Sequence, residues 1–416
     1  TDRRHEVMNL MKKGSIAVFY SNDEMPRTAD QIFPFRQESA LFAISGIDQP
    51  GTIIVLFPEA KKKSEREIAF ILPADPQHTI WNGERLTPKE AQKISGITNI
   101  RTVTDLDRIM TPLFHTVQSI YLNIADLSVP AQIINQNERM ALKLKSIFPF
   151  HVFHSVQPIL RKLLMRKHKA EIDLMKKAID VTAQGFNHVL REIKPGMKEY
   201  EVEAMLSYTF VRNACGHAFQ PIIASGASAC ILHYVQNDRR IGKEDLVLLD
   251  FGAEYANMAS DMSRTIPASG RFTKEQKKFY NSVLKVLREA TSFMTPGNTL
   301  TEIQKESGNL IEHELISLGL CSRREVKRQD PKSPLWKKYF MHGISHHLGY
   351  DVHDHADRNA TLKSGMVLTC EPGLYIPEMK LGIRLENDIL VTRSAPKDLM
   401  AHVPIEIEEI ESIMQS

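Results

Sequence analysis

The stretch LVLLDFGAEYANMASDMSRT, residues 246–265, decides the fold because it places two acids beside core-like strands. Asp250 closes the apolar run LVLL, and Asp261 follows eleven residues later. Further along the chain, Glu371 comes directly after VLTC, and Glu386 lies inside IRLENDILV. Burying a carboxylate within a strand is costly unless it is paired or binds a cation. The pattern therefore predicts four acids that require positive charge, unless each one faces water at a strand end.

Positive charge is scarce near these acids. Arg264 and Arg384 are the only lysine or arginine residues within four positions of any of them. Two divalent metal ions are the natural alternative, since four carboxylates supply a charge of about −4 and two such ions about +4. A histidine can complete the shell of such a pair. The acids therefore predict a two-metal hydrolytic centre.

Histidines gather in MHGISHHLGYDVHDH, residues 341–355, which holds five of the 16 histidines of the chain. These five are His342, His346, His347, His353 and His355. Taken alone, His347 and His355 are expected to be surface side chains. One isolated histidine, His233 in CILHY, is expected to be an ordinary core or surface residue. The cluster is the predicted source of the histidine ligand.

Length and composition exclude several classes of protein. The chain has 416 residues, with 53 lysines and arginines against 50 acids, which are ordinary globular proportions and enough for two or three domains. A net charge of +3 gives no sustained basic field, so we expect no nucleic-acid partner. No apolar run approaches the roughly 18 residues that a membrane span needs, so we expect no membrane segment.

The cysteines and the first residue bear on the compartment. Four cysteines without a C-x-x-C pair are too sparse for a disulfide scaffold and fit a reducing compartment, with the cytoplasm as the default expectation. They are Cys215, Cys230, Cys321 and Cys370. The chain begins at Thr1 rather than Met, which indicates processing or trimming, and its opening residues lack the apolar region of a signal peptide.

The pattern of apolar residues changes near residues 158–168. Before this boundary, short apolar runs alternate with helix-like stretches, which predicts an α/β domain over residues 1–160. After it, an amphipathic helix over residues 167–193 opens a larger domain, residues 161–416. Two capping boxes start further helices, and the runs MVLTCEPGLYI and GIRLENDILVT read as strands. We therefore expect an α+β second domain.

Six stretches together resemble the pita-bread metallopeptidases, the group of aminopeptidase P, prolidase and methionine aminopeptidase. They are ASGASACILHY, LVLLDFGAEY, SDMSRT, FMHGISHHLGYDVHD, GMVLTCEPGLY and GIRLENDILVT, in this order. Before them, RTADQIFPFRQESALFAISGI from Arg27 and IWNGER around Trp81 are similar to the smaller domain of aminopeptidase P, which methionine aminopeptidases lack. The resemblance is therefore closest to aminopeptidase P. It implies an α/β N-terminal domain followed by an α+β pita-bread catalytic domain.

The resemblance also implies roles for residues at matching positions. Five would be ligands of two divalent metal ions: Asp250, Asp261, His346, Glu371 and Glu386. In the family, Asp261 and Glu386 hold both ions, Asp250 chelates one, and His346 with Glu371 hold the other. As a ligand beside the attacking water, Glu371 would also shuttle the proton. Three catalytic histidines would contact the substrate or the tetrahedral intermediate: His233, His342 and His353.

Other matching positions concern the substrate. Tyr375 and Arg384, with His342, match positions near the proline pocket of the family. Trp81 matches a tryptophan that can reach the site of a neighbouring subunit, so we expect a homo-oligomer. His347 stands where aminopeptidases P commonly have a bulky aromatic residue, which leaves the preference for the first residue open.

The resemblance implies hydrolysis of the N-terminal Xaa-Pro bond in peptides with proline second. Manganese is the expected metal, with zinc, cobalt and iron as alternatives. Two other functions remain open: an Xaa-Pro dipeptidase of the prolidase kind, and a catalytically silent binding module on the same fold. All ligand positions hold the residue types of the family, which argues against creatinase and the chaperone-type pseudo-peptidases, because their ligands are replaced.

Overall fold

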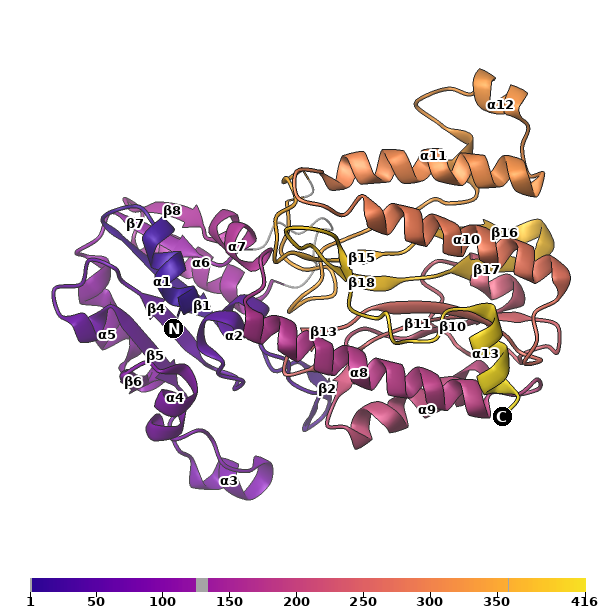
Figure 1. The fold of residues 1–416 in the computed structure, drawn as a ribbon. Coiled ribbons are helices and arrows are strands. Elements are labelled where there is room, and N and C mark those ends of the chain that lie inside the picture. Colours follow the sequence, from indigo (N-terminus) through magenta and orange to yellow (C-terminus); the bar gives the residue numbers. More distant parts are fainter. Residues whose placement is uncertain (1, 125–133, 358) are drawn as a thin grey trace. The chain divides into compact units, whose positions relative to one another are not determined.

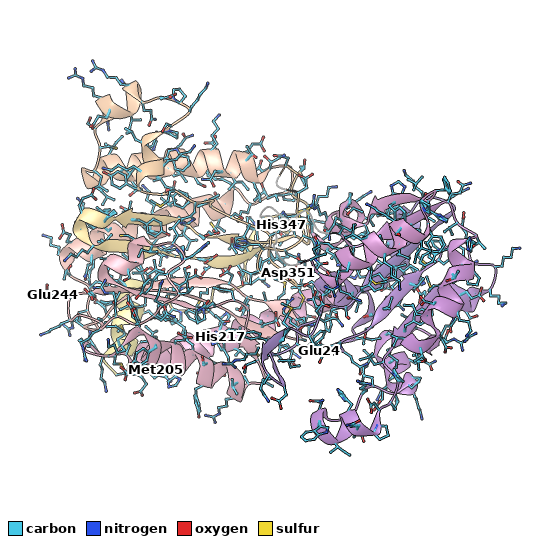
Figure 2. The ribbon with its side chains drawn as sticks, turned by 180° about the vertical axis from the view of Figure 1, so that it is seen from behind. Glu24, Met205, His217, Glu244, His347 and Asp351 are labelled. Atoms are coloured by element: carbon cyan, nitrogen blue, oxygen red, sulfur yellow. The ribbon has the colours of Figure 1, made fainter. Side chains whose placement is uncertain are left out.

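The computed structural model describes residues 2–124, 134–357 and 359–416, and it divides into two compact units (Figure 1). The first unit is Thr1–Leu163 and the second is Leu164–Ser416. The division expected from the sequence lies a few residues earlier. Figure 2, the view from behind, shows side chains filling the space between helices and sheets within each unit.

The first unit is built on a mixed six-stranded sheet in the order β6-β5-β4-β1-β7-β8. The sheet strands are β1 (Ser15–Tyr20), β4 (Ile53–Leu56), β5 (Glu67–Ile71), β6 (Asn99–Thr102), β7 (Ser119–Leu122) and β8 (Val152–Ser155). A small ribbon pairs β2 (Pro26–Thr28) with β3 (Gln31–Ile32). The helices are α1 (Asp2–Leu10), α2 (Ser39–Ser45), α3 (Pro76–Asn82), α4 (Pro88–Ser95), α5 (Leu106–Phe114), α6 (Gln136–Ile147) and α7 (Gln157–Leu164).

Every residue of the central strand β1 is buried, and its sequence SIAVFY is accordingly apolar without alternation. Ile16 and Val18 share one hydrophobic cluster with Phe114 of α5 and Leu144 of α6. The side chains of neighbouring residues point to opposite faces of a strand, so the burial of Ala17 shows that the other face is covered too. The α/β class expected for this part of the chain is confirmed.

The second unit carries several small sheets, in the orders β10-β11-β14, β13-β12-β9, β15-β18-β19 and β16-β17. Its strands are β9 (Gly216–His217), β10 (Ile222–Ser225), β11 (Leu246–Phe251), β12 (Ala253–Tyr255), β13 (Met258–Ala259), β14 (Met262–Pro267), β15 (Val367–Cys370), β16 (Gly373–Ile376), β17 (Leu381–Arg384), β18 (Asn387–Leu390) and β19 (Lys397–Asp398). Its helices are α8 (Lys169–Glu192), α9 (Glu199–Arg212), α10 (Lys274–Ser292), α11 (Leu300–Leu318), α12 (Arg323–Arg328) and α13 (Ile407–Met414).

The sheets of the second unit lie between two helix pairs, α8 with α9 and α10 with α11 (Figure 1). The two predicted capping boxes begin α10 and α11: Thr273 with Gln276, and Thr299 with Glu302. The expected α+β class is therefore confirmed. Among the described residues, no helix has the length and apolar character that crossing a membrane requires.

One expectation about the strands is wrong. MVLTCEPGLYI and GIRLENDILVT, each read as one strand, are both broken in two, and the pieces form one bent hairpin. On one side of the bend Cys370 pairs with Asn387, and on the other Gly373 pairs with Arg384. Pro372 lies in the gap, where its lack of an N–H group costs no ladder bond. The bend leaves the two glutamates of the gap, Glu371 and Glu386, outside the strands.

Candidate active site

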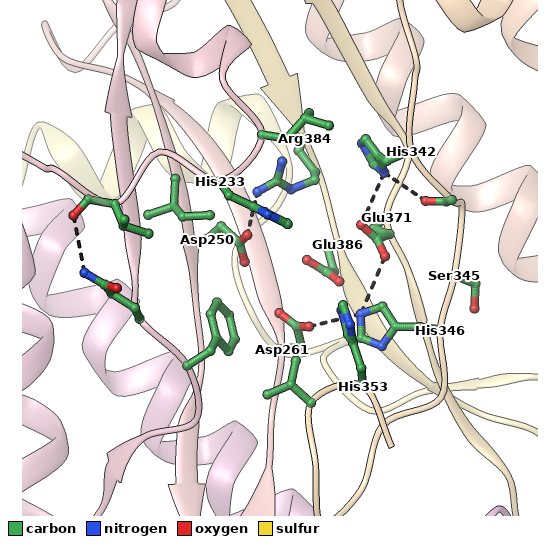
Figure 3. Close-up of a pocket in the computed structure, with 17 residues that line it drawn as sticks. His233, Asp250, Asp261, His342, Ser345, His346, His353, Glu371, Arg384 and Glu386 are labelled. Atoms are coloured by element: carbon green, nitrogen blue, oxygen red, sulfur yellow. Dashed lines mark hydrogen bonds and ion pairs between the residues drawn. The ribbon is translucent and has the colours of Figure 1, made fainter. Parts of the chain in front are cut away.

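All five predicted metal ligands line one pocket of about 570 Å³ in the second unit (Figure 3). They are Asp250, Asp261, His346, Glu371 and Glu386. The three predicted catalytic histidines line the same pocket: His233, His342 and His353. The structure therefore brings together acids and histidines that are spread over about 150 positions of the sequence, an arrangement that separate strand-end acids facing water would not produce.

The two aspartates meet because β11 and β14 are neighbours in one sheet. Asp250 on β11 pairs with Ser263 on β14, and Asp261 lies one residue before β14 begins. The chain between them passes very close to itself at Gly252, where a Cβ would lie 1.8 Å from the carbonyl oxygen of Ser260. Only glycine permits this approach, so the motif DFG is part of how the acids are positioned.

His346 and Glu371 meet because the histidine loop, residues 341–355, docks on β15. The N–H of Thr369 donates to His346 O at 2.9 Å, and the N–H of Glu371 donates to Ile344 O at 3.0 Å. The N–H of His346 in turn donates to the Thr369 hydroxyl at 3.1 Å. These bonds place His346 Nε2 3.6 Å from Glu371 Oε1 and 3.3 Å from Asp261 Oδ2.

Burial and mutual repulsion shape the electrostatics of the acids. Burial, followed by the charges of Asp250 and other neighbouring acids, raises the pKa of Asp261 well above its ordinary value. Burial, followed by Asp261 and Glu371, does the same to the pKa of Glu386. Burial also raises the pKa of Glu371, although His346 and Arg384 oppose it. A buried cluster of carboxylates with pKa values raised in this way calls for cations.

The residues present fit divalent metal ions. One ligand atom each from Asp261, His346 and Glu386 lies within 4.8 Å of the others. Asp250 Oδ1 is buried and has no hydrogen-bond partner in the part of the chain that the structure describes. Carboxylate oxygens with one imidazole and no sulfur form a shell suited to hard or borderline divalent cations.

Arg384 is a protein cation beside these ligands. Its Nη2 lies 2.5 Å from Asp250 Oδ2, and its Nε donates to Ser263 Oγ at 2.8 Å. The Ser263 hydroxyl then donates to Glu386 Oε2, also at 2.8 Å. One guanidinium thus orients two predicted ligands, but it offers a single positive charge to four carboxylates.

Tyr375 connects Arg384 to His342. The Tyr375 hydroxyl accepts from Arg384 Nη1 at 2.9 Å and lies 2.8 Å from His342 Nε2. Burial, followed by Arg384, lowers the pKa of His342 to about 3, so the ring is neutral. His342 Nδ1 lies 2.8 Å from Gly343 O, which can only accept. The proton is therefore on Nδ1, and Nε2 accepts from the Tyr375 hydroxyl.

Several sequence-predicted residues lie elsewhere. Trp81 is on α3 of the first unit and is 78% exposed. Tyr375 is fully buried and is not among the residues that line the pocket. His347, labelled in Figure 2, was expected at the surface, but it is only 2% exposed, so that expectation is wrong. It does not line the pocket either, and burial lowers its pKa to about 4. His355 is half-buried.

Sequence reasoning missed residues that support the ligands. The Thr369 hydroxyl donates to Glu371 Oε1 at 3.3 Å. Asp388 is fully buried and accepts the N–H of Asp261 at 3.3 Å. Thr369 lies two positions before Glu371, and Asp388 lies two positions after Glu386. In a strand-like run, residues two positions apart are expected on the same face. That spacing is the signal that could have found both residues.

Comparisons with known proteins cover nearly the whole chain. Residues 173–393 match the model of metallopeptidase family M24, and residues 1–121 match that of the aminopeptidase P N-terminal domain. Xaa-Pro aminopeptidase of Haemophilus influenzae is 31% identical, over 99% of this chain and 96% of its own length. A Bacillus anthracis structure assigned to aminopeptidase P superposes with a TM-score of 0.93 at 33% identity, covering 100% and 97% of the two chains. The structure of zinc-substituted Escherichia coli aminopeptidase P in complex with product superposes with a TM-score of 0.87 at 29% identity. It also covers 100% of this chain and 97% of its own.

Proposed function

Because the chain belongs to metallopeptidase family M24, we propose that it is a metal-dependent Xaa-Pro aminopeptidase, which removes the first residue from peptides with proline second. The observation that carries this proposal is the convergence of five ligand-type side chains in one pocket. The Xaa-Pro aminopeptidases of Haemophilus influenzae and Escherichia coli match 99% of this chain over 96% of their own length, and an Escherichia coli aminopeptidase P was solved with its product. A silent binding module is disfavoured because every ligand position is retained.

Asp250, Asp261, His346, Glu371 and Glu386 would hold two divalent ions. When bound, such ions would lower the pKa of the attacking water towards neutrality and would polarise the carbonyl of the scissile bond. We propose manganese as the metal, because an oxygen-rich shell with one imidazole suits it. Zinc, cobalt and iron are the alternatives, and elemental analysis of protein purified without added metal distinguishes them.

Glu371 is the proposed proton shuttle. Burial raises its pKa, although His346 and Arg384 oppose this, and a carboxyl group beside the attacking water can accept and then release its proton. The Thr369 hydroxyl donates to Oε1 at 3.3 Å and holds the carboxylate on that side, and His342 Nδ1 lies 3.4 Å from Oε2. Glu371 therefore takes the proton of the attacking water and passes it to the leaving amine.

The hydrogen bonds that the ring nitrogens already make indicate different roles for the histidines of the pocket. Both nitrogens of His342 are engaged, by Gly343 O and by the Tyr375 hydroxyl. We therefore propose that His342 orients Tyr375, instead of donating to the oxyanion. His353 and His233, which line the same pocket, are the proposed contacts for the substrate and the tetrahedral intermediate.

The charge of the pocket favours aminopeptidase over dipeptidase activity. A dipeptidase of the prolidase kind must bind the free carboxylate that follows proline. Arg384 is the sole lysine or arginine among the described residues that line the pocket, and Asp250, Ser263 and Tyr375 engage its three guanidinium nitrogens. The pocket thus offers no spare cation of these kinds, and a longer peptide avoids the need for one.

The preference for the first residue follows from the apolar part of the same pocket. One group of its lining residues is apolar: Phe219, Ile222, Leu232, Val235 and Val352. The acids are the other large group of residues that line the pocket. We therefore propose that substrates with an uncharged, apolar first residue are favoured and that substrates with an acidic first residue are repelled.

We propose a homo-oligomer because two apolar side chains of α3 are exposed. Ile80 and Trp81 are adjacent on this helix, and their exposed fractions are 81% and 78%. An apolar pair of this kind favours contact with a second copy. A parent protein and W81A variant that both run as monomers in light scattering would exclude the oligomer. The cytoplasm stays the prediction for location, supported by four free cysteines.

The decisive experiment compares an Xaa-Pro dipeptide with an Xaa-Pro tripeptide, with and without a chelator. We expect cleavage of the tripeptide at the first bond, loss of activity with chelator and recovery with manganese. Cleavage of the dipeptide alone would establish the prolidase alternative. Undiminished activity in metal-free protein would reject the metallopeptidase mechanism.

A further inference from the structure

A second buried ionic contact lies beside the histidine loop and takes no part in the chemistry described above. Lys167 Nζ lies 2.6 Å from Asp354 Oδ2, and the two side chains are 1% and 0% exposed. The ammonium group also donates to Leu164 O at 2.9 Å. The N–H of Lys167 donates to Gly365 O at 2.8 Å. The contact therefore joins segments that are 187 positions apart in the sequence.

Asp354 is placed to control the part of the loop that enters the pocket. It directly follows His353, which lines the pocket and whose ring centroid lies 4.3 Å from that of His346. The N–H of Asp354 donates to His347 O at 3.0 Å. The residue after His353 is thus fixed both by its backbone and by its side chain.

The ion pair also packs directly against the backbone of the loop. A Cβ at Gly349 would lie 2.1 Å from Asp354 Oδ2 and 2.6 Å from Lys167 Cε. Gly349 O accepts the N–H of Ala259 at 2.8 Å, which ties the same point to β13. Apart from one bridge at His347, the loop has no regular structure between Met341 and Asp357. These contacts therefore define its course.

The carboxyl group of this pair is ionised. Burial alone would raise the pKa of Asp354, but Lys167 and His355 outweigh it, and the pKa lies below its usual range. Opposite charges held in the interior attract strongly and fix each other, and removing one partner leaves the other buried without compensation. A neutral side chain at position 167 would therefore release or displace Asp354.

From these contacts we infer that Lys167 is a positioning residue, which acts through Asp354 to hold the His353 ring in the pocket. The inference rests on the proposed function, in which His353 contacts the reacting peptide. Displacing a group of this kind by about 1 Å costs on the order of a hundredfold in rate. Lys167 is itself buried and is not among the residues that line the pocket, so its effect must pass through the loop.

The test is a double-mutant cycle on the full manganese-loaded chain, with K167M, H353A and the double variant assayed on an Xaa-Pro tripeptide. K169M is the matched control, because Lys169 is exposed and lies two positions away. We expect K167M to lower kcat about tenfold or more with KM changed less than about threefold, and to add little in the H353A background. K167R should restore part of kcat, and K169M should match the parent protein.

The inference would be overturned by a parent-like kcat in K167M, or by losses in K167M and H353A that simply multiply. Elemental analysis is the second readout, and metal content should equal that of the parent; metal loss in K167M would assign the pair to the metal centre instead. If K167M does not fold, K167M/D354N, which leaves no lone buried charge, enters the same cycle. A parent and K169M that both fail to cleave the peptide would reject the proposed function, and the inference with it.

Discussion

Glu371 and Glu386 lie opposite each other at the bend of one β-hairpin, each in a two-residue gap between strands. Their backbone N–H groups donate out of the hairpin, to Ile344 O and Ser263 O, both at 3.0 Å. The same bend is therefore bonded to the histidine loop and to the strand that follows Asp261. The ligand cluster is assembled by backbone pairing, which is the preorganisation that a catalytic site requires.

Glu371→Gln should abolish most of the activity while the fold is kept. The amide cannot accept the proton of the attacking water, so we expect kcat to fall by on the order of a thousandfold with a small change in melting temperature. Steady-state kinetics and calorimetry measure both. The exposed Glu378→Gln is the control, and a Glu371→Gln enzyme within about tenfold of the parent would contradict the role assigned here.

Asp261→Asn should reduce metal content. Asp261 shares a cluster with His346 and Glu386, and its loss removes one charged ligand from the centre. We expect metal affinity to fall by about tenfold or more, measured by elemental analysis after dialysis and by titration with manganese. Asp173→Asn, on the exposed face of α8, should retain full metal content. Equal content in both variants would count against the assignment.

The stability of metal-free protein should depend on pH through the crowded acids. The folded pKa values of Asp261 and Glu386 are raised. Their stabilising contribution is therefore complete below the unfolded pKa of about 4 and is lost as the pH rises through the folded values. Metal ions bind the ionised carboxylates of these two residues. Bound metal therefore offsets the stability that the metal-free protein loses as the pH rises.

The gap in melting temperature between metal-loaded and metal-free protein should accordingly widen from about pH 5 to about pH 8. Calorimetry at the two pH values, with and without chelator, measures it. In the Asp261→Asn variant this difference in melting temperature should increase less between the two pH values, because one titrating group has been removed. A constant gap would show that the acids are not coupled in this way.

Tyr375→Phe should impair catalysis without loss of metal. The change removes the donor to His342 Nε2 and the acceptor for Arg384 Nη1. We expect kcat to fall about tenfold, since an orienting contact is lost while the ligands remain. The imidazole nitrogen resonances of His342 should shift in NMR spectra. Tyr208→Phe, at an exposed site on α9, is the control.

Gly252→Ala should destabilise the second unit. The new Cβ would lie 1.8 Å from Ser260 O, a backbone atom that cannot rotate away. We expect a loss of about 2 kcal/mol or more in the free energy of unfolding. Chemical denaturation measures it. Gly216→Ala provides the comparison, since nothing lies within 4 Å of its Cβ, and similar losses in both would remove the steric explanation.

Local signals made the strands and helices of this chain predictable. Apolar runs such as SIAVFY became strands, and the Thr273 capping box began α10 where the spacing indicated. The break at Glu371 and Glu386 was not predictable from hydrophobicity, because both halves of each run are apolar. The break depends on strands that pair in two different sheets. Pro372 was the available signal.

The candidate site was predictable as a set of residue types but not as a geometry. Acids beside strands indicated cations, whereas the ring orientation of His342 depends on Tyr375, 33 positions away. His347 shows the limit most clearly, since taken alone it was expected at the surface and only packing buries it. Lys167 carried no local signal, because its partner is remote in the sequence.

The bent hairpin has a consequence for how this chain tolerates change in length. Its tip, residues 377–380, lies beyond the last ladder pair, Ile376 with Leu381. Residues inserted at the tip would lengthen the turn and leave the register of both arms intact. A single residue inserted between Val367 and Glu371 would instead rotate one arm by a full face and turn its acid away from its counterpart. Insertions and deletions should therefore be tolerated at the tip, whereas a few residues further in they should disrupt the ligand cluster.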